Sequence, residues 1–503
     1  MQLLSKARTG IKGLDEITLG GLPQGRPTLV CGGPGCGKTL FSMEFLVKGA
    51  TLFNEPGVFM AFEEKAEELA VNVASLGFDL AKLQKQKKMV LDFVQIERSE
   101  LEETGDYDLD GLFIRLEHAI NSIGARRVVL DTIENMFAGL TNQGILRAEL
   151  RRLFLWLKEK GVTTIITGEQ GDGKLTRQGL EEYVSDCVIL LDHRIINQIS
   201  TRRLRVVKYR GSVHGTNEYP FLIDEEGFSV LPVTSLTLDK TVSSQRISTG
   251  IPSLDEMLGG KGFYQGSSIL VSGTAGTGKS SIAAYFANAV CQRKEKCIYF
   301  AFEESPKQIM RNMKSIGINL EPHVKSGLLQ FHSSRPSLYG LERHLAIIYK
   351  LVKTVRPLTV ILDPITNLVS VGLINEVNSM LLRLIDFLQN EGITVMFTAL
   401  TGVLNERMDE GVSSLVDTWI SVRNIEANGE RNRALYVMKS RGMKHSNKVR
   451  EFVISDKGLN LIEAYRGEGG NIIIGSEREI METQKHSGNK RGKNEDRKKP
   501  AGK

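Results

Sequence analysis

Short apolar runs alternate along the chain with longer segments whose apolar positions follow the helical period. The runs at 27–31 and 268–272 precede glycine-rich turns, whereas 145–158 and 378–389 carry the apolar stripe of an amphipathic helix. Buried strands that alternate with amphipathic helices are typical of parallel sheets with crossover helices. We therefore predict an α/β protein whose central sheets are mainly parallel.

The whole pattern occurs twice. Matching segments in the two halves are the TGI…LDE openings (9–25 and 249–266), strands that end in paired glutamates (57–65 and 297–305), strands that end in aspartate (125–137 and 356–368) and charged strand segments (206–221 and 437–452). A polar stretch without a strong period, 231–248, separates the halves. The predicted domains are 1–240 and 241–465, and 466–503 forms a C-terminal segment.

Two glycine-rich segments, GGPGCGKT at 32–39 and GTAGTGKS at 273–280, fit the phosphate-loop pattern. Each follows an apolar strand and opens a helix, which is the required order. Loop N–H groups bind phosphates at the helix N-terminus, the lysine reaches the terminal phosphates and the hydroxyl ligates Mg²⁺. A chance glycine-rich turn is disfavoured because the match occurs twice. The expected ATP ligands are Gly32, Gly33, Gly35, Gly37, Lys38, Thr39, Gly273, Gly276, Thr277, Gly278, Lys279 and Ser280, with Thr39 and Ser280 on Mg²⁺.

Acidic residues at strand ends supply the next parts of an ATP site. An ATPase or kinase needs a carboxylate that activates the nucleophile and an acid for the Mg²⁺-bound water. A lone strand-end acid is often a solvated loop residue, but repetition at matching positions favours catalysis. The expected catalytic acids are Glu63 and Glu303, with Glu64 and Glu304 as auxiliaries, and Asp131 and Asp363 for the Mg²⁺-bound water.

A Lys-x-Arg pair followed by histidine recurs late in each half. The matching residues are Lys208, Arg210 and His214 in the first half, and Lys439, Arg441 and His445 in the second. A solvated strand edge would explain one such pair. Recurrence with histidine at the same spacing favours cations that reach the phosphates of a neighbouring subunit, as arginine fingers do in trans.

The halves differ in front of the strand that follows Asp186 and Asp417. The aligned residues are Glu182 and Tyr183 in the first half, and Ser413 and Ser414 in the second. Adjacent serines are usually turn or capping residues. The residues alone therefore leave their role open.

Composition and charge indicate a globular protein and argue against a nucleic-acid-binding function. The chain has 503 residues, of which 41% are hydrophobic and 25% charged, enough apolar residues to fill two cores. Its net charge of +6 comes from the tail 485–503, where eight Lys/Arg face two acids. The body is close to neutral and lacks the basic balance of a nucleic-acid binder. We expect the tail to be disordered, with at most a weak affinity for acidic partners.

The cysteines and the hydropathy of the chain indicate in which cellular compartment we expect the protein. Five cysteines without paired zinc spacing predict reduced, mostly buried thiols. The start has no signal-peptide core, and no apolar run approaches the roughly 18 residues of a membrane span. We expect a cytoplasmic protein that contacts no membrane.

Taken together, the doubled openings, phosphate loops, FEE acids and KYRG/KSRG segments resemble the KaiC family, the double-domain RecA-like ATPases and autokinases of the circadian clock. The resemblance covers about residues 5–465. It implies two tandem RecA-like phosphate-loop domains and a double-ring homo-hexamer with ATP between subunits. It also implies that Lys208, Arg210, Lys439 and Arg441 touch the adjacent subunit's nucleotide.

In that family the first ring is mainly a slow ATPase, and the second transfers phosphate to and from a serine and a threonine. The resemblance therefore implies that Ser413 and Ser414 are the acceptors, with Glu303 as general base and Glu63 positioning water. Serine replaces the threonine at 414, and Met408 stands where the clock protein has another hydroxyl. These departures put an oscillating phosphorylation cycle in doubt and fit a divergent homologue.

The segment after Leu461 also departs from the family, which argues against regulation by KaiA. A KaiB-like partner on the first ring stays an open expectation. Two other function classes also stay open: a RecA-type DNA recombinase or helicase, and a nucleotide-dependent scaffold without kinase activity. The near-neutral body and the lack of an added DNA-binding module count against the first, and autophosphorylation would exclude the second.

Overall fold

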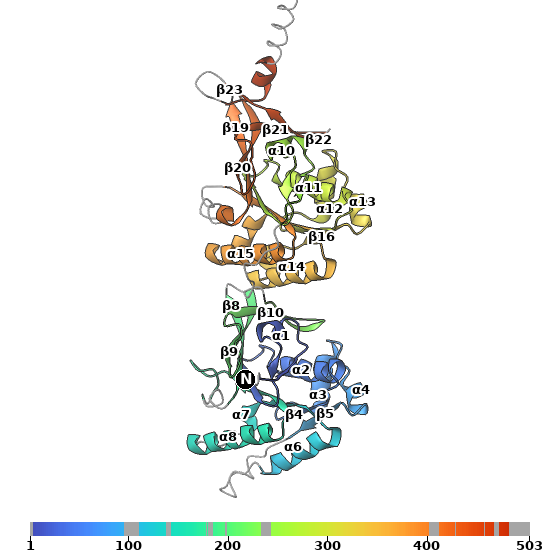
Figure 1. Cartoon of the computed structure of the whole chain (residues 1–503), viewed down its shortest axis with the longest axis vertical. Helices are drawn as coiled ribbons and strands as arrows, with labels where there is room; N and C mark the ends of the chain where they lie inside the picture. The colour runs from blue at the N-terminus through green and yellow to red at the C-terminus, as the bar shows by residue number, and fades with distance from the viewer. Residues whose placement is uncertain are drawn as a thin grey trace, which may run out of the picture. The chain divides into compact units, whose positions relative to one another are not determined.

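The computed structural model describes residues 4–94, 110–136, 142–177, 179, 185–196, 199–232, 243–401, 412–427, 429–456, 458–466 and 472–481. The chain forms two compact units whose main border follows Leu236 (Figure 1). The border predicted near residue 240 falls outside the described residues and stays a prediction. The whole basic tail, Met408, Glu182 and Tyr183 also lie outside them.

A nine-stranded sheet in the order β11-β10-β9-β8-β3-β7-β6-β4-β5 forms the centre of the first unit. Neighbouring strands from β5 to β8 are parallel, and β9 to β11 extend the sheet antiparallel. The strands are β3 (Pro27–Gly32), β4 (Gly57–Ala61), β5 (Met89–Phe93), β6 (Arg127–Asp131), β7 (Thr163–Glu169), β8 (Cys187–Ile196), β9 (Ile199–Tyr209), β10 (Glu218–Asp224) and β11 (Gly227–Val230).

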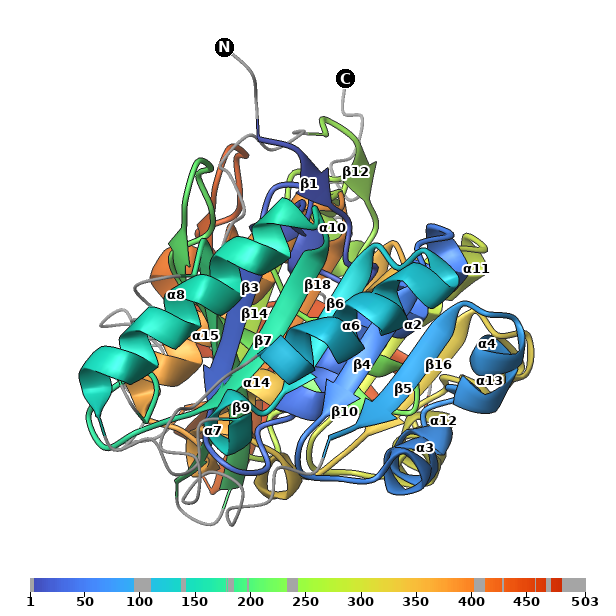
Figure 2. The same cartoon turned by 90° about the horizontal axis from the view of Figure 1, so that it is seen from below.

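Helices cover both faces of this sheet. Because successive strand residues point to opposite faces, Val129 packs with Phe45 of α2, whereas Val128 packs with residues of α6 and α8. Figure 2 shows α6 and α8 lying across one face. The helices are α1 (Leu14–Ile17), α2 (Lys38–Leu52), α3 (Ala66–Ala74), α4 (Leu80–Lys85), α6 (Asp110–Ile123), α7 (Ile133–Met136) and α8 (Gln143–Glu159), and β1 (Lys6–Ala7) pairs with β2 (Leu22–Pro23).

The second unit repeats this topology, with the order β16-β15-β17-β18-β14-β19-β20-β21-β22. Its strands are β14 (Ser268–Gly273), β15 (Cys297–Ala301), β16 (Leu329–Ser333), β17 (Thr359–Asp363), β18 (Thr394–Leu400), β19 (Thr418–Ala427), β20 (Glu430–Ser440), β21 (Arg450–Ser455) and β22 (Gly458–Glu463), and two small pairs are β12 (Arg246–Ile247) with β13 (Phe263–Tyr264) and β23 (Tyr465–Arg466) with β24 (Ile472–Ile473). Its helices are α10 (Pro252–Met257), α11 (Lys279–Gln292), α12 (Pro306–Lys314), α13 (Glu321–Lys325), η1 (Pro336–Leu338), α14 (Leu341–Val355), η2 (Ile365–Ser370) and α15 (Ile374–Asn390). The prediction of two α/β domains with mainly parallel sheets is confirmed.

One side chain ties the phosphate-loop helix of each unit to the outermost strand hairpin. In the first unit the Glu44 carboxylate of α2 accepts a hydrogen bond of 2.6 Å from the Phe228 N–H of β11. In the second unit the Tyr285 hydroxyl of α11 accepts one of 2.8 Å from the Leu459 N–H of β22. The same backbone group is therefore satisfied by an ionisable acid in one unit and by a phenol in the other.

Glu44 is 1% exposed, and this burial raises the pKa of its carboxyl from 4.5 to about 7. The Phe228 N–H and the charges of Lys48 and Lys12 oppose the shift, while Asp224 adds to it. A raised pKa of the folded state means that the folded chain binds the proton more tightly than the unfolded chain. The associated stability is complete below pH 4.5 and is lost as the pH rises through about 7.

We expect the β10–β11 hairpin to loosen between pH 5 and 8 in the wild type and to stay unchanged in Glu44→Gln, whose amide still accepts the Phe228 hydrogen bond. The expected change is on the order of 3 kcal/mol. Hydrogen-exchange protection factors of residues 227–230 measure it, and residues 458–461 in the same sample are the internal control. Equal pH responses of the two hairpins would contradict the account.

Candidate functional site

The two glycine-rich loops have the geometry of phosphate-binding loops. The first joins β3 to α2 and the second joins β14 to α11, so each ends at a helix N-terminus. Gly37 and Gly278 adopt φ values of 100° and 94°, which only glycine adopts readily. A Cβ at Gly37 would also lie 2.8 Å from Ile223 of β10, and one at Gly278 2.7 Å from Ile454 of β21. The positive φ values therefore favour glycine at these positions, and any side chain there would also have to displace side chains of the hairpin strands.

Both loop lysines are almost buried and lie over their own loops. The Lys38 ammonium donates to the carbonyls of Gly32 and Gly33 at 2.9 and 3.1 Å. The Lys279 ammonium donates to the Thr274 carbonyl at 2.7 Å. A cation beside loop N–H groups at a helix N-terminus fits the terminal phosphates of a nucleotide.

Asp131 and Asp363 end β6 and β17, and each is 7% exposed. Thr167 donates to Asp131 and Thr398 donates to Asp363, so the two carboxylates have equivalent partners on the next strand. Burial raises the pKa of Asp131, while Thr167, Thr39 and the Lys38 charge oppose the shift. Carboxylate and hydroxyl oxygens are the hard ligands that Mg²⁺ prefers, so this set fits the cation or its bound water.

The paired glutamates follow β4 and β15 directly. The Glu64 carboxylate accepts from the Asn72 amide at 3.3 Å, and the Glu304 carboxylate accepts from the Asn312 amide at 3.2 Å. The first glutamate of each pair, at 63 and 303, is exposed and has no hydrogen-bond partner within the described part of the chain. Its carboxylate is therefore available for a substrate.

These groups lie at one edge of each sheet. Strands β3, β6 and β4 are parallel, so their carboxyl ends place the phosphate loop, Asp131 and Glu63 along the same edge. Strands β14, β17 and β15 do the same for the second loop, Asp363 and Glu303. Ligands of open α/β sheets bind at this edge.

The Lys-x-Arg pair and the serines of the second unit lie together at the opposite edge. Lys439 and Arg441 donate to the carbonyls of Ser413 and Ser414, each at 2.7 Å. Burial lowers the pKa of Lys439, the neighbouring Arg441 charge adds to the shift and Asp417 opposes it. The structure therefore brings the predicted cations and predicted acceptors together.

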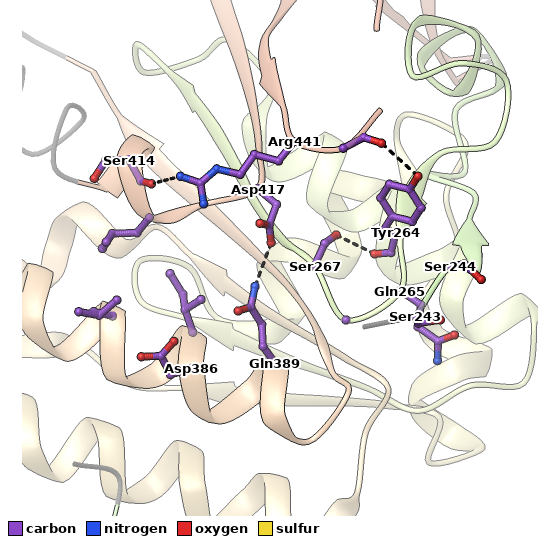
Figure 3. Close-up of a pocket in the computed structure, with 15 residues that line it drawn as sticks. Ser243, Ser244, Tyr264, Gln265, Ser267, Asp386, Gln389, Ser414, Asp417 and Arg441 are labelled. Carbon is purple, nitrogen blue, oxygen red and sulfur yellow. Dashed lines mark hydrogen bonds between the residues drawn. The ribbon is translucent and has the colours of Figure 1, made fainter. Parts of the chain in front are cut away.

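A cavity of about 760 Å³ opens beside Ser414 and Arg441. Figure 3 shows the Arg441 guanidinium reaching the Ser414 carbonyl, with Asp417 held by Gln389 close by. The cavity is also lined by Tyr264 and by residues of α15. It leaves room for an incoming group next to the serine.

The strand β14 separates this cluster from the phosphate loop of the same chain. The loop begins at Gly273, the last residue of β14, whereas Asp417 binds Ser268, the first. The strand has six residues and rises about 3.3 Å per residue, so its ends are about 16 Å apart. A phosphate on Lys279 is therefore out of reach of Ser414 in the same protomer.

The first unit has the same layout with different contacts. Lys208 and Arg210 lie near the amino end of β8, and Asp186 there interacts with Lys158 at 2.5 Å and Arg210 at 4.0 Å. The His214 ring stacks on Tyr209, with centroids 6.2 Å apart. Within the described part of the chain, no ring stacking gives His445 a matching role.

An arginine that was not predicted from the sequence lies at the same edge as each phosphate loop. Arg433 of β20 donates to the Gly276 carbonyl at 3.3 Å, and Arg202 is its counterpart in β9. Both stand six residues before the Lys-x-Arg pair, and this spacing was the only signal in the sequence. The antiparallel strand β20 thus places Arg433 beside the phosphate loop of its own unit. The same strand leads to Lys439 and Arg441 at the opposite edge of the sheet.

Two further absences apply to the described residues. None of their helices combines the length and apolar character that a membrane span needs. They also contain no cluster of three or more His, Cys, Asp and Glu side chains that would hold a metal. All five cysteines are buried and free, as predicted.

Comparison with known proteins agrees with the doubled site. A family model described as "ATPase: KaiC" matches residues 7–235 and again residues 247–466. The circadian clock protein KaiC2 of Synechocystis sp. is 57% identical over 96% of this chain and 86% of its own length. The circadian clock oscillator proteins KaiC of Synechococcus elongatus and Thermosynechococcus vestitus are each 37% identical over 96% of this chain and 94% and 93% of their own lengths. This chain therefore belongs to the KaiC family of ATPases.

Proposed function

We propose that the chain is an ATP-hydrolysing Ser/Thr autokinase that works as a double-ring homo-hexamer, with ATP and Mg²⁺ between subunits. The first unit mainly hydrolyses ATP, and the second phosphorylates Ser413 and Ser414. Family membership and two complete sets of phosphate-loop residues support the ATPase.

The observation that carries the kinase proposal is the position of the two serines. They lie at the amino end of β14, about 16 Å from the phosphate loop at its carboxyl end. Donor and acceptor meet only when the carboxyl edge of one protomer faces the amino edge of the next. Such a heterologous contact closes into a ring when the rotation permits.

In this arrangement one protomer supplies the loop and the acids, and its neighbour supplies cations and acceptors. Glu303 acts as general base toward a serine hydroxyl, and Glu63 positions water. When Mg²⁺ is bound, it neutralises charge on the phosphates. The supporting residues are Glu64 and Glu304 as auxiliaries, Asp131 with Thr39 and Asp363 with Ser280 at the cation, and Lys208, Arg210, His214, Lys439, Arg441 and His445 at the neighbour's phosphates.

For partners, the family relation supports a KaiB-like protein on the first unit. The divergent segment after Leu461 supports independence from KaiA. The named relatives are circadian clock proteins, so a clock-like or signalling role is the process we propose.

Removing one phosphate-loop lysine at a time should separate the two units. Lys279→Ala should reduce phosphate incorporation at Ser413 and Ser414 by about 100-fold or more, because the second unit loses its phosphate ligand. Lys38→Ala should mainly lower basal hydrolysis and assembly. Labelling with γ-labelled ATP followed by peptide mapping measures both. Equal incorporation in the two variants would refute this division, and no label on either serine in the wild type would favour a scaffold.

Mixed rings should show transfer between protomers. Lys279→Ala chains keep the acceptors but lose the second donor site, and Ser413→Ala/Ser414→Ala chains keep the donor site but lose the acceptors. Neither preparation alone should take up label, whereas rings co-assembled from both should label the Lys279→Ala chain, identified by a size tag. Absence of label in co-assembled rings would contradict transfer in trans.

A further inference from the structure

Residues 59 and 299 occupy the same place in the two units but differ by one hydroxyl. Phe59 is the third residue of β4 and Tyr299 the third of β15. Phe59 pairs with Val129 of β6, and Tyr299 with Ile361 of β17, two residues before the strand-end aspartate in both cases. Both side chains are fully buried. The two units can therefore be compared to find the effect of a single hydroxyl group at this position.

The additional oxygen contacts the acid of the second site. The Tyr299 hydroxyl donates to Asp363 Oδ2 at 2.5 Å, and Thr398 donates to Oδ1. Both oxygens of the Asp363 carboxylate are therefore held by the sheet. The equivalent Asp131 interacts with Thr167 and Thr39, and Phe59 offers it nothing polar. Within the sheet, Asp363 therefore accepts hydrogen bonds from two strand residues, whereas Asp131 accepts one from Thr167.

A hydroxyl hydrogen bond to a carboxylate at 2.5 Å lies at the short end of the usual range. No water competes for it, because Tyr299 is fully buried. Two donors on opposite oxygens also restrict rotation of the carboxylate. Groups behind a metal-binding residue orient it, and their loss typically costs 10- to 100-fold in metal affinity or activity.

We propose that Tyr299 is a positioning residue of the second nucleotide site, which fixes the Asp363 carboxylate in the orientation that receives the Mg²⁺-bound water. The first site lacks this device. The inference rests on the proposed role of Asp363 and adds to it a reason for the two sites to differ. Tyr299 itself touches neither nucleotide nor cation.

The test measures the Mg²⁺ dependence of nucleotide binding by the full chain. The probe is a fluorescent non-hydrolysable ATP analogue, mant-AMPPNP, titrated with MgCl₂, and Lys279→Ala identifies the second-site transition by removing it. Tyr299→Phe should raise the Mg²⁺ concentration at half-saturation of that transition about 10-fold. Binding at saturating Mg²⁺ and the first-site transition should not change.

Tyr285→Phe is the matched control, since it removes another tyrosyl hydroxyl and one hydrogen bond in the same unit without touching Asp363. It should leave the Mg²⁺ midpoint unchanged. The same midpoint in Tyr299→Phe and wild type, or equal shifts in both tyrosine variants, would overturn the positioning role. If Lys279→Ala removes no Mg²⁺-dependent transition, the proposed nucleotide site itself fails, which is a different result.

Discussion

Each unit separates its phosphate-binding edge from its cationic edge by the length of a strand. In the second unit the loop begins where β14 ends, and Lys439 and Arg441 hold the serine backbone where β14 begins. Parallel strands place the phosphate loop and the strand-end acids at one edge, and the antiparallel return of β20 brings Lys439 and Arg441 to the other. The proposed ring and kinase reaction depend on this separation, because a site that includes both edges of the second unit would need a second protomer.

Duplication lets each unit serve as a reference for the other. The topology, the phosphate-loop pattern and the strand-end acids are shared, so matching positions that carry different residues can explain differences between the two sites. Phe59 and Tyr299 differ in a contact to the strand-end acid, and Glu44 and Tyr285 differ in the tie to the hairpin. The first exchange changes the support of the strand-end acid, the second changes only the tie between the phosphate-loop helix and the outer hairpin, and neither alters the expected ligands of the nucleotide.

The sequence predicted the parts of the molecule that local patterns encode. The helix predicted at 145–158 is α8 (Gln143–Glu159), and the strand predicted at 27–31 is β3 (Pro27–Gly32). The phosphate loops were predictable because glycine, lysine and hydroxyl must occur at fixed spacing between a strand and a helix. The repeat singled out Lys439 and Arg441, but their contacts with the serine carbonyls required coordinates, and their role at a neighbour's phosphates stays a prediction.

Contacts between distant strands were not predictable. In the sequence, Tyr299 looks like any other residue of an apolar strand. Its hydroxyl can donate to Asp363 only because β17 lies beside β15. Arg433 similarly depends on the path of β20 past the loop. Glu44 lies within α2, which is buried over most of its surface, and nothing in the local sequence shows that the Phe228 N–H will donate to it.

The central claim is that each ATP pocket is completed by a neighbouring chain. Native mass spectrometry of the full-length protein with and without ATP tests it most directly. We expect nucleotide only in closed hexamers, with two nucleotides per chain, and smaller assemblies for chains without nucleotide. A monomer that retains both nucleotides would contradict it.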